Sequence, residues 1–334
     1  MKKYHVYGIG NALVDIDFEV DIQTLTSLNI EKGVMTLIDE QRHHQLLKHL
    51  DGKQQQQICG GSAANTIIAI AQFGGRCFYS CKVANDPTGD FYFQDLMANR
   101  VDTNLSANNR PEGHTGKCIV LVTHDADRTM NTHLGITATL STAEINANAI
   151  ANSEYIYIEG FLVGSPSALK AALKTKALAQ QHQVKTAFTL SDCNMTRYFS
   201  QELQQVIGDG VDLLFCNEAE ALSYTDTTQL NIAMSQLQKI AKQFVVTLGA
   251  KGSVIFDGKQ YIDIAPVLTK PIDTVGAGDI YAGAFLFGIT HGYSLREAGM
   301  QASIAAAKIV AKIGPRLTHE EAYQLAQELK RQHL

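Results

Sequence analysis

The stretch Asp273-Thr274-Val275-Gly276-Ala277-Gly278-Asp279 leads directly into the apolar segment Ile280-Tyr281-Ala282-Gly283-Ala284-Phe285-Leu286. We expect an apolar helix to begin at or just inside the glycines. The backbone N–H groups of a helix's first turn have no partner within the helix, and with the helix dipole they form a site for an anion. Gly276 and Gly278 would let the backbone approach a phosphate closely. The stretch therefore predicts a phosphate site at the start of a late helix.

Asp279 closes this turn, where a carboxylate would be repelled by a bound phosphate. Such a carboxylate is useful if it takes a proton from an attacking hydroxyl during phosphoryl transfer. The alternative is a plain helix cap, since an Asp there typically contributes about 1 kcal/mol. Asp273 and Thr274 add polar groups before the turn, and no G-x-x-x-x-G-K-[ST] motif offers another phosphate site. A dinucleotide fingerprint is also absent, because Gly8-Ile9-Gly10-Asn11 stops short of G-x-G-x-x-G.

Short β-branched runs alternate with longer helical patterns along the chain, which is typical of βαβ units. We predict an α/β fold with a doubly wound, mostly parallel sheet flanked by helices. The expected strands are residues 4–9, 76–84, 155–161, 185–190, 211–216 and 244–248. The expected helices are residues 62–73, 91–100, 167–183, 201–207 and 230–242, with an almost wholly helical C-terminal third after Gly278.

Two regions interrupt this rhythm. Residues 13–20, 34–38, 117–123 and 129–134 alternate as half-buried strands do. We expect them to form a small antiparallel lid, inserted at about residues 12–39 and 116–135 into a single domain that covers residues 1–334. The glutamine run at 54–57 is interpreted as the exposed start of a further strand.

The composition excludes several classes of protein. Of the 334 residues, 45% are hydrophobic and 18% charged, which suits a large core and excludes a disordered chain. The net charge of −5 provides no basic field for nucleic acid. No run reaches the roughly 18 apolar residues of a membrane span, and no secretory segment opens the chain, so we expect a cytoplasmic protein. The six Cys form no C-x-x-C pair, which favours reduced thiols.

Two motifs together resemble the ribokinase and adenosine kinase family, the PfkB-type carbohydrate and nucleoside kinases. One is the stretch from Asp273 to Asp279, and the other is the glycine pair in Gly60-Gly61-Ser62-Ala63-Ala64-Asn65. The likeness runs from Tyr4 to about Arg316. It implies a ribokinase-like fold, ATP as phosphate donor and Mg²⁺ as cofactor. In that family the residue matching Asp279 is the catalytic base, and Gly276, Ala277 and Gly278 form the anion hole.

The resemblance also implies a site for the acceptor molecule, formed by Asn11, Asp15, Gly60, Gly61 and Asn65. A vicinal diol needs paired donors and acceptors, which a carboxylate and two amides supply. The glycines would let a sugar ring lie against the backbone. Turn or cap chemistry is the alternative for Asn11 and Asn65.

For the donor side, Asn217-Glu218-Ala219-Glu220 matches the family's N-x-x-E motif, in which Glu220 organises magnesium, often through water, and phosphate, with Asn217 as an amide of the same cofactor site. A helix start with acidic residues is the alternative. Thr247-Leu248-Gly249-Ala250-Lys251-Gly252 resembles the nucleotide-binding turn. Thr247, Gly249 and Gly252 would line the ATP site beside Thr274. Several relatives bind a monovalent cation, and Asp273 with the carbonyl of Val275 is positioned like its ligands, so potassium is a further expectation.

The acceptor itself is the harder question. Residues 31–40 and 128–132 look most like bacterial adenosine kinase-like members. Leu13, Leu37 and Phe161 would suit a flat purine, although they are equally ordinary core residues. Arg128, between two lid strands, could close over the phosphates as a bidentate partner, or it could be a solvated turn residue. We expect phosphorylation of a nucleoside at the ribose 5′-hydroxyl.

Two alternatives remain open. A free sugar such as fructose or ribose would be phosphorylated by the same machinery. A catalytically silent nucleotide- or sugar-binding regulator would be expected to lack the base or the anion-hole glycines. We expect small-molecule partners only, with no nucleic acid and no membrane, and either a monomer or a homodimer.

Overall fold

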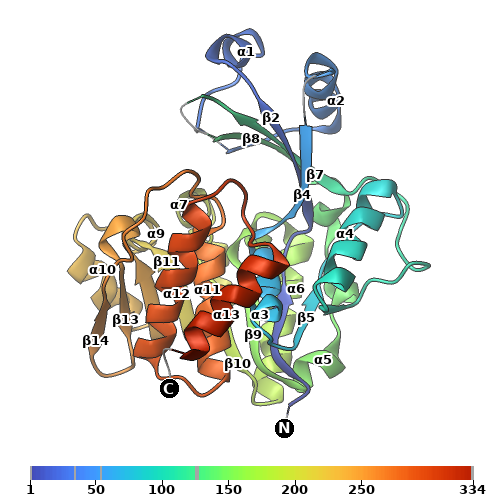
Figure 1. Ribbon diagram of the computed structural model, residues 1–334. Coiled ribbons are helices and arrows are strands. Elements are labelled where there is room, and N and C mark those ends of the chain that lie inside the picture. The colour runs from blue at the N-terminus through green and yellow to red at the C-terminus, as the bar shows by residue number, and fades with distance from the viewer. Residues whose placement is uncertain (1, 34, 53–54, 125–127, 332–334) are drawn as a thin grey trace.

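The computed structural model describes residues 2–33, 35–52, 55–124 and 128–331. It shows a large α/β body with a smaller lid above it, and the N-terminus lies at the end of the body remote from the lid (Figure 1). Within the described ranges no helix is both long and apolar enough to cross a membrane.

The body is built on one nine-stranded sheet in the order β14-β13-β12-β11-β10-β9-β1-β5-β6. Strands β6, β5, β1, β9, β10, β11 and β12 pair in parallel, whereas β13 and β14 run antiparallel at one edge. The bounds are β1 Tyr4–Ile9, β5 Cys77–Ser80, β6 Asp102–Thr103, β9 Ser153–Glu159, β10 Lys185–Thr189, β11 Val211–Asn217, β12 Ala241–Thr247, β13 Ser253–Phe256 and β14 Tyr261–Ile264. The predicted doubly wound, mostly parallel fold is confirmed.

Helices cover both faces of this sheet. One core cluster joins it to α3, α4, α11, α12 and α13, and a second cluster joins the other face to α5 through α10. The bounds are α3 Ser62–Gln72, α4 Pro87–Ala98, α5 Ala147–Ala151, α6 Pro166–Gln181, α7 Cys193–Tyr198, α8 Ser200–Ile207, α9 Glu218–Tyr224, α10 Leu230–Leu237, α11 Ala277–Thr290, α12 Leu295–Val310 and α13 His319–Arg331. Four short 3₁₀ segments are η1 Gly135–Thr139, η2 Thr142–Glu144, η3 Gly160–Gly164 and η4 Gly249–Lys251. Because strand side chains alternate in direction, these continuous apolar strands fill both clusters.

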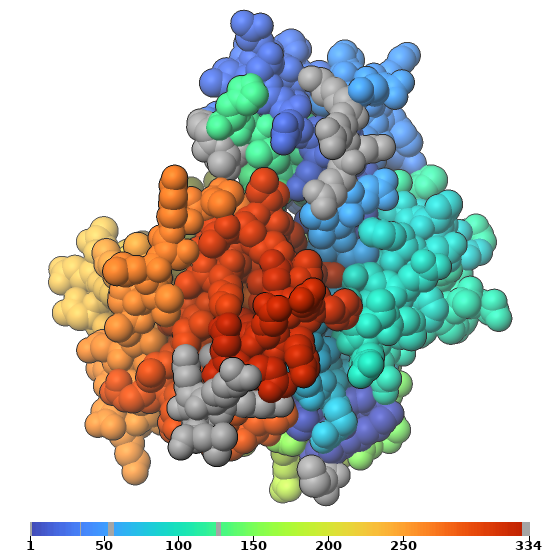
Figure 2. Space-filling view, in the orientation of Figure 1, coloured from blue at the N-terminus to red at the C-terminus, as the bar shows by residue number. Residues whose placement is uncertain are grey.

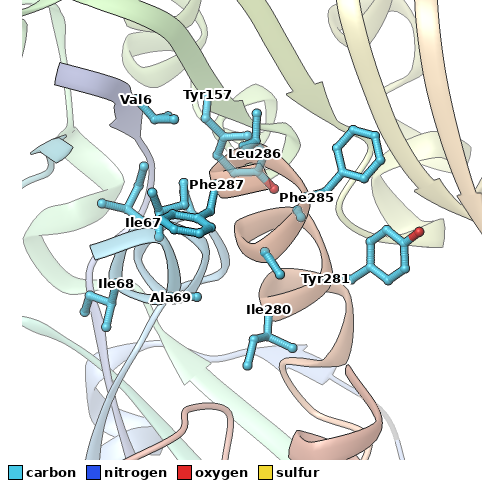
Figure 3. Packing of buried hydrophobic residues seen from close by; sticks show 14 of the residues in the cluster. Val6, Ile67, Ile68, Ala69, Tyr157, Ile280, Tyr281, Phe285, Leu286 and Phe287 are labelled. Atoms are coloured by element: carbon cyan, nitrogen blue, oxygen red, sulfur yellow. The ribbon is translucent and has the colours of Figure 1, made fainter. Parts of the chain in front are cut away.

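Helices α3 and α11 pack closely in the first cluster, although they are far apart in sequence. Figure 3 shows Ala69 of α3 on the side toward α11, and Phe287 of α11 beside Ile67 of α3. A Cβ added to Gly283 would lie 2.8 Å from the Cβ of Ala69, so the glycine allows the two helices to approach. This contact brings the two sequence motifs, one at the start of each helix, to the same end of the body.

The lid is a five-stranded sheet in the order β3-β8-β7-β2-β4, where four antiparallel strands were expected. Its bounds are β2 Leu13–Glu19, β3 Met35–Leu37, β4 Gln55–Gly60, β7 Gly116–Val122 and β8 Arg128–His133, with helices α1 Ile22–Ser27 and α2 Glu40–His49. The antiparallel expectation is wrong for two pairs, because β2 pairs in parallel with β7, and β3 in parallel with β8. Since β2 and β7 belong to separate excursions of the chain, both can leave the body in the same direction.

The lid insert also extends further than residues 12–39, because α2 and β4 belong to it. The glutamine run does begin a strand at Gln55, whereas Gln54 lies outside the described residues, as does Val34 at the start of the expected strand 34–38. The lid has its own small core, in which Ile16, Phe18 and Leu121 pack against α1 and α2. Figure 2 shows the blue and green lid above the orange and red C-terminal third and continuous with the blue and cyan part of the body.

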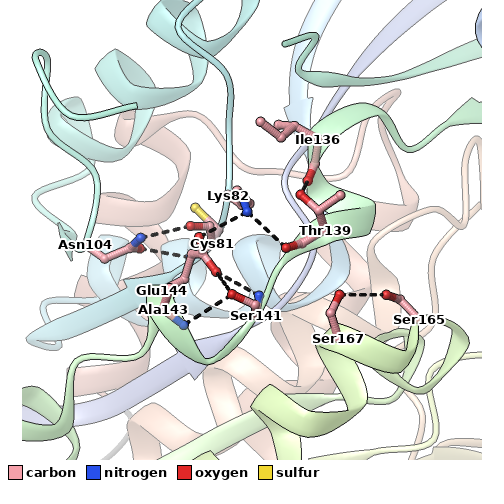
Figure 4. A network of polar contacts seen from close by, with 10 residues as sticks. All are labelled: Cys81, Lys82, Asn104, Ile136, Thr139, Ser141, Ala143, Glu144, Ser165 and Ser167. Carbon is pink, nitrogen blue, oxygen red and sulfur yellow. Dashed lines mark hydrogen bonds and ion pairs between the residues drawn. The ribbon is translucent and has the colours of Figure 1, made fainter. Parts of the chain in front are cut away.

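A polar network fixes the chain where it returns from the lid to the body (Figure 4). The Lys82 ammonium donates to the carbonyl of Thr139 at 3.0 Å and lies 3.3 Å from the Glu144 carboxylate. Cys81 and Asn104 exchange backbone and amide hydrogen bonds, both 3.0 Å long. The network ties η1 and η2, which follow β8, to the segment after β5, so the lid is anchored on a fixed base.

Several elements differ from those expected. The strand predicted at 76–84 is confined to Cys77–Ser80, and the residues that follow take part in the network just described. The helix predicted at 230–242 ends at Leu237, and the last of those residues begin strand β12. The edge strands β13 and β14 were missed, because each has only four residues and too short a pattern to detect.

Candidate active site

The glycine turn lies at the carboxyl end of the sheet and starts helix α11 as predicted. Gly276 is the N-cap in the left-handed region, with φ of 77°, and the helix begins at Ala277. A Cβ at Gly276 would lie 2.5 Å from the carbonyl oxygen of Pro315, so only glycine fits. The space next to Gly278 is open, because an added Cβ there would meet nothing within 4 Å. The turn thus presents free space at a helix N-terminus, where an anion is favoured.

Asp279 lies in the first turn of α11 and contacts two residues of the other motif, Ser62 and Asn65. Its carboxylate accepts hydrogen bonds from Ser62 Oγ at 2.6 Å and from Asn65 Nδ2 at 2.9 Å. Burial raises the pKa of Asp279 to about 6, against the lowering effect of these two hydrogen bonds. A carboxylate with such a pKa is ionised at neutral pH and remains basic enough to accept a proton.

The second layer around Asp279 includes an arginine that the sequence did not reveal. Arg316 Nε donates to Asn65 Oδ1 at 2.7 Å, and Arg316 Nη1 lies 2.5 Å from the Asp95 carboxylate of α4. Asn65 is 6% exposed, and both ends of its amide are engaged within the protein. In this structure Asn65 therefore acts on Asp279, whereas it was predicted to bind the acceptor.

A second buried carboxylate, Glu159, holds the start of the predicted acceptor site. It ends β9 and accepts from the backbone N and Nδ2 of Asn11, at 3.2 and 3.1 Å, and from the backbone N of Ala63 at 2.8 Å. Burial raises the pKa of Glu159 to about 7. Gly61, with φ of 102°, lies against the Asn11 carbonyl, where a Cβ would approach to 2.4 Å. Sequence reasoning missed Glu159, although its place at a strand's carboxyl end was a usable signal.

These residues meet where the strand order reverses. From β1 the chain first builds β5 and β6 on one side, then returns to add β9 and its successors on the other side. Asn11 follows β1, and Glu159 ends β9. Open α/β sheets place ligands at such a switch point.

Asp15 projects from β2 on the lid face that is turned toward the body. Leu37, Thr132, Cys118 and Asp15 form one row across four neighbouring strands, so their side chains share this face. Burial and the neighbouring Asp17 raise the pKa of Asp15 to about 7. A Cβ at Gly60 would lie 2.7 Å from Asp15 Oδ2, so this glycine allows the carboxylate to sit on the backbone as predicted for an acceptor site.

Of the three apolar residues predicted to contact a purine, two lie on this lid face. Leu13 is two residues from Asp15 on β2, and Leu37 is 60% exposed. Phe161 lies instead in η3, partly buried against the second core cluster of the body. Phe161 thus has the core role that was its alternative.

A cavity of about 400 Å³ lies beside the glycine turn. The predicted nucleotide residues Thr247, Gly249, Gly252 and Thr274 line it together with Ala277 and Gly278. The sequence did not predict the remaining lining residues, which come from η4, from the loop after β14 and from α11 and α12: Ala250, Pro266, Val267, Leu268, Thr269, Pro271, Tyr281, Ser303, Ala306, Ala307 and Val310. Mostly apolar walls with a few polar groups at one end suit a nucleotide whose base is buried.

Asn217 and Glu220 do not line this cavity but form a capping box at the start of α9. Glu220 Oε1 accepts from Asn217 Nδ2 at 2.6 Å, and the backbone N of Glu220 donates to Asn217 Oδ1 at 2.8 Å. Asn217 and Glu220 therefore do have the helix-capping role that was the alternative to a magnesium and phosphate site. Burial raises the pKa of Glu220 to about 7, and the charges of Asp192 and Asp279 raise it too. A cation would relieve this excess of negative charge.

The described residues hold no cluster of three or more His, Cys, Asp or Glu side chains that could bind a metal by themselves. Mg²⁺ typically keeps several waters and is completed by substrate phosphates, so this donor set fits a water-mediated ion near Glu220. Glu220 would hold such an ion beside the phosphates, where its charge offsets that of the transferred group.

Arg128 links the lid to the glycine turn. Its guanidinium pairs with Asp17 of the lid and lies 3.2 Å from the carboxylate of Asp273 in the body. Asp273 also accepts from the backbone N of Val275 at 3.0 Å and of Gly314 at 2.9 Å. Arg128 is thus no solvated turn residue, and it supplies the positive charge at the place predicted for a monovalent cation.

Three features fit a small-molecule phosphotransferase with an alcohol group as acceptor: an open helix start that favours an anion, a partly buried carboxylate in its first turn and an adjoining cavity of nucleotide size. The chain belongs to the pfkB family carbohydrate kinases, whose family model matches residues 32–322. Kinases of this family use ATP as phosphate donor.

Solved structures and curated relatives agree with this assignment. The chain is similar to a probable sugar kinase protein from Rhizobium etli CFN 42, with 32% identity, a TM-score of 0.90 and coverage of 100% of this chain and 99% of that one. It is equally similar to the adenosine kinase from Sinorhizobium meliloti, with 35% identity, a TM-score of 0.89 and coverage of 99% and 100%. Adenosine kinase 1 from Arabidopsis thaliana is 26% identical, over 87% of this chain and 89% of its own length.

Proposed function

We propose that this protein transfers the γ-phosphate of ATP to the 5′-hydroxyl of a nucleoside, most simply adenosine. The observation that carries the proposal is the place of Asp279, between the cavity lined by Gly278 and the start of α3, where Ser62 and Asn65 donate to its carboxylate. A donor phosphate at the glycine turn and an acceptor hydroxyl at Asp279 would then face each other.

In the proposed step, Asp279 takes the proton of the 5′-hydroxyl as its oxygen bonds to the γ-phosphorus. The bond from that phosphorus to the β,γ-bridging oxygen breaks, and ADP leaves with the electron pair. Negative charge on the transferred group would meet the backbone N–H groups at the start of α11, beside Gly276, Ala277 and Gly278. Preorganised donors of this kind are usually the largest catalytic contribution at such a site.

The acceptor assignment rests on the lid face that carries Asp15 and Leu37. Asp15 can accept both hydrogens of a ribose diol, and Leu13 and Leu37 offer apolar surface to a base. The large exposed fraction of Leu37, 60%, is surface that a ligand could cover. The similarity to the adenosine kinase from Sinorhizobium meliloti supports a nucleoside.

A free sugar remains the second candidate, because the similarity to a probable sugar kinase from Rhizobium etli is as close. A free sugar would use Asp15, Asn11 and the glycine pair while leaving Leu37 uncovered. Potassium near Asp273 and Val275 is also proposed, and it would require Arg128 to move away from Asp273.

A panel of acceptors tests the proposal: adenosine, other nucleosides, ribose and fructose, each with ATP and magnesium, read as ADP release. Turnover of adenosine without turnover of ribose or fructose is expected. Asp279→Asn should fold and bind ADP but lose at least about 10²-fold in kcat, since it removes the general base. Sugar turnover alone would select the second candidate, and no turnover of any acceptor would favour a binding regulator.

A further inference from the structure

The guanidinium of Arg316 is buried behind Asn65, the residue whose amide donates to Asp279. Its side chain is 10% exposed and spans two elements, since it contacts Asn65 of α3 and Asp95 of α4. We propose that Arg316 is a positioning residue, which holds Asn65 in the one amide orientation that donates a hydrogen bond to Asp279. The kinetic part of this inference rests on the proposed function, whereas the structural part does not.

The chemistry of an amide makes this orientation important. Oδ1 can only accept a hydrogen bond and Nδ2 can only donate, so exchanging the two ends reverses both contacts. Arg316 Nε is a donor that cannot be deprotonated, and it therefore selects Oδ1 of Asn65. Nδ2 must then face the carboxylate of Asp279, as the 2.9 Å hydrogen bond shows. Without Arg316 the Asn65 amide loses the contact that fixes Oδ1, and it can move away from the carboxylate of Asp279.

The guanidinium is itself held in place from the opposite side. Asp95, its ion-pair partner at 2.5 Å, also accepts from Asn99 Nδ2 at 3.2 Å, one turn further along α4. Among the described residues, Arg316 Nη2 is buried and has no hydrogen-bond partner. The contacts of Nε with Asn65 and of Nη1 with Asp95 thus fix the plane of the guanidinium. A lysine ammonium, which is a point charge on a flexible chain, could not make both contacts.

The arrangement has a consequence for proton affinity. The hydrogen bond from Asn65 and the charge of Arg316 both lower the pKa of Asp279, while its burial raises it. The other titratable groups that interact electrostatically with Asp279 come from three elements: Asp15 of β2, Tyr157 and Glu159 of β9, and Glu220 of α9. The three carboxyls oppose ionisation of Asp279 when they are charged, whereas burial raises the pKa of Tyr157, so that its hydroxyl is neutral and adds no charge. Loss of the amide donor would therefore raise the pKa of Asp279.

Arg316→Lys is the decisive variant, because lysine keeps the charge but cannot contact Asn65 and Asp95 in one rigid plane. We expect the pKa of Asp279 to rise by at least half a unit in the unliganded protein, measured by NMR titration of ¹³C-labelled Asp carboxyls and assigned with Asp279→Asn. The acid limb of the pH profile of kcat should move to higher pH by a similar amount. At its optimum kcat should fall about tenfold or more, because the base is misplaced, with the KM for ATP unchanged.

Arg110→Lys is the matched control. Arg110 is also buried, pairs with Asp90 of α4 and lies over the ring of Phe93 at 5.9 Å. Its replacement should cost stability without moving the titration of Asp279. Asn65→Ala combined with Arg316→Lys should show no further rise in the pKa of Asp279 beyond that of Asn65→Ala alone, since Arg316 acts through the amide.

The outcomes separate the inference from the proposed function. An unchanged titration of Asp279 in folded Arg316→Lys, or a shift equal to that of Arg110→Lys, would overturn the inference and leave the kinase proposal untouched. A raised pKa of Asp279 together with full activity of Asp279→Asn would support the positioning role and refute the catalytic base.

Discussion

At the residue scale, the site is a group of carboxyls that are costly to bury. Asp15, Glu159 and Glu220 have pKa values raised to about 7, and that of Asp279 is raised to about 6, in each case chiefly by burial. Buried charge is tolerated where it serves chemistry, so such groups concentrate at functional sites. The molecule should therefore lose stability through the same carboxylates that its proposed reaction needs.

Stability measurements on Asp279→Asn can test whether the buried carboxylate of Asp279 destabilises the fold. The pKa of Asp279 is raised above its unfolded value of 3.8, so its ionised form destabilises the fold above pH 6 and the penalty disappears as the pH falls toward 4. Relative to the native protein, Asp279→Asn should thus gain melting temperature with rising pH. We expect the difference between pH 5 and pH 7.5 to be about 2–4 °C.

The control for this test is Asp257→Asn, at an exposed turn where backbone hydrogen bonds lower the pKa of the carboxyl. Its effect on the melting temperature should be the same at both pH values, because Asp257 is ionised at both. If the melting temperature of Asp279→Asn relative to the native protein stayed constant or fell between pH 5 and pH 7.5, the raised pKa of Asp279 would be contradicted.

The sequence predicted the local part of the site and missed the distant part. Gly276, Gly278 and Asp279 were found because they are adjacent and their spacing has a physical meaning. Glu159 and Arg316 were missed, because the hydrogen bonds that define them join residues 148 and 251 positions apart. No local pattern marks such contacts, and they appear only once α3, α11 and β9 are assembled.

At the element scale, the two glycines at the start of α11 have different structural roles. Gly276 is needed for its left-handed φ and its contact with Pro315, whereas Gly278 has an ordinary helical φ and faces open space. The first is thus a structural requirement of the turn. The second leaves room at the helix N-terminus, where a phosphate would bind.

Alanine at each position should separate these two tasks. Gly276→Ala should lower the free energy of unfolding by about 1–3 kcal/mol, because it strains the backbone and collides with Pro315. Gly278→Ala should leave that free energy unchanged or raise it by up to about 1 kcal/mol, since alanine favours a helix, yet it should raise the KM for ATP and lower kcat. Chemical denaturation and steady-state kinetics measure both. Equal stability losses for the two variants would contradict the assignment.

Helices and strands long enough to show a repeating hydrophobic pattern were predicted well, whereas short ones were not. Helix α6, of 16 residues, and strand β11, of seven, lie within two residues of their predicted bounds. Strand β4 was foreseen only as the start of a strand, since its glutamines give no alternation, and its place in the lid sheet depends on pairing with β2. Strand order in the lid could not be predicted, because side-chain alternation does not distinguish parallel from antiparallel neighbours.

At the scale of the whole molecule, the lid meets the body at the turn that would hold the phosphate. The side chains of Arg128 and Asp273 are 8% and 6% exposed, so their ion pair is shielded from water. Breaking one partner of a shielded pair is more costly than breaking a surface pair. We therefore expect Arg128 to restrain the lid while the site is empty and to be available to phosphate when ATP arrives.

Arg128→Gln should accordingly release the lid. Loss of about 1–3 kcal/mol of lid–body interaction would shift the lid's equilibrium toward open conformations by about 5- to 150-fold. Spin labels at Gln45→Cys on the lid and Lys259→Cys on the body, in a Cys193→Ser background, report this as a longer and broader distance distribution by pulsed electron resonance. Both labelled positions are exposed, and the other five native cysteines are buried.

Arg42→Gln is the control for this variant, because Arg42 donates to the carbonyl of Leu28 and so acts within the lid alone. It should leave the distance distribution as in the native protein. Adenosine with a non-hydrolysable ATP analogue should shorten the mean distance in the native protein and in Arg42→Gln, and less so in Arg128→Gln, which lacks the guanidinium that the phosphates would attract. If all three proteins gave the same distribution without ligand, the lid would be held by its strand connections and the polar network around Lys82, and Arg128 would have no part in restraining it.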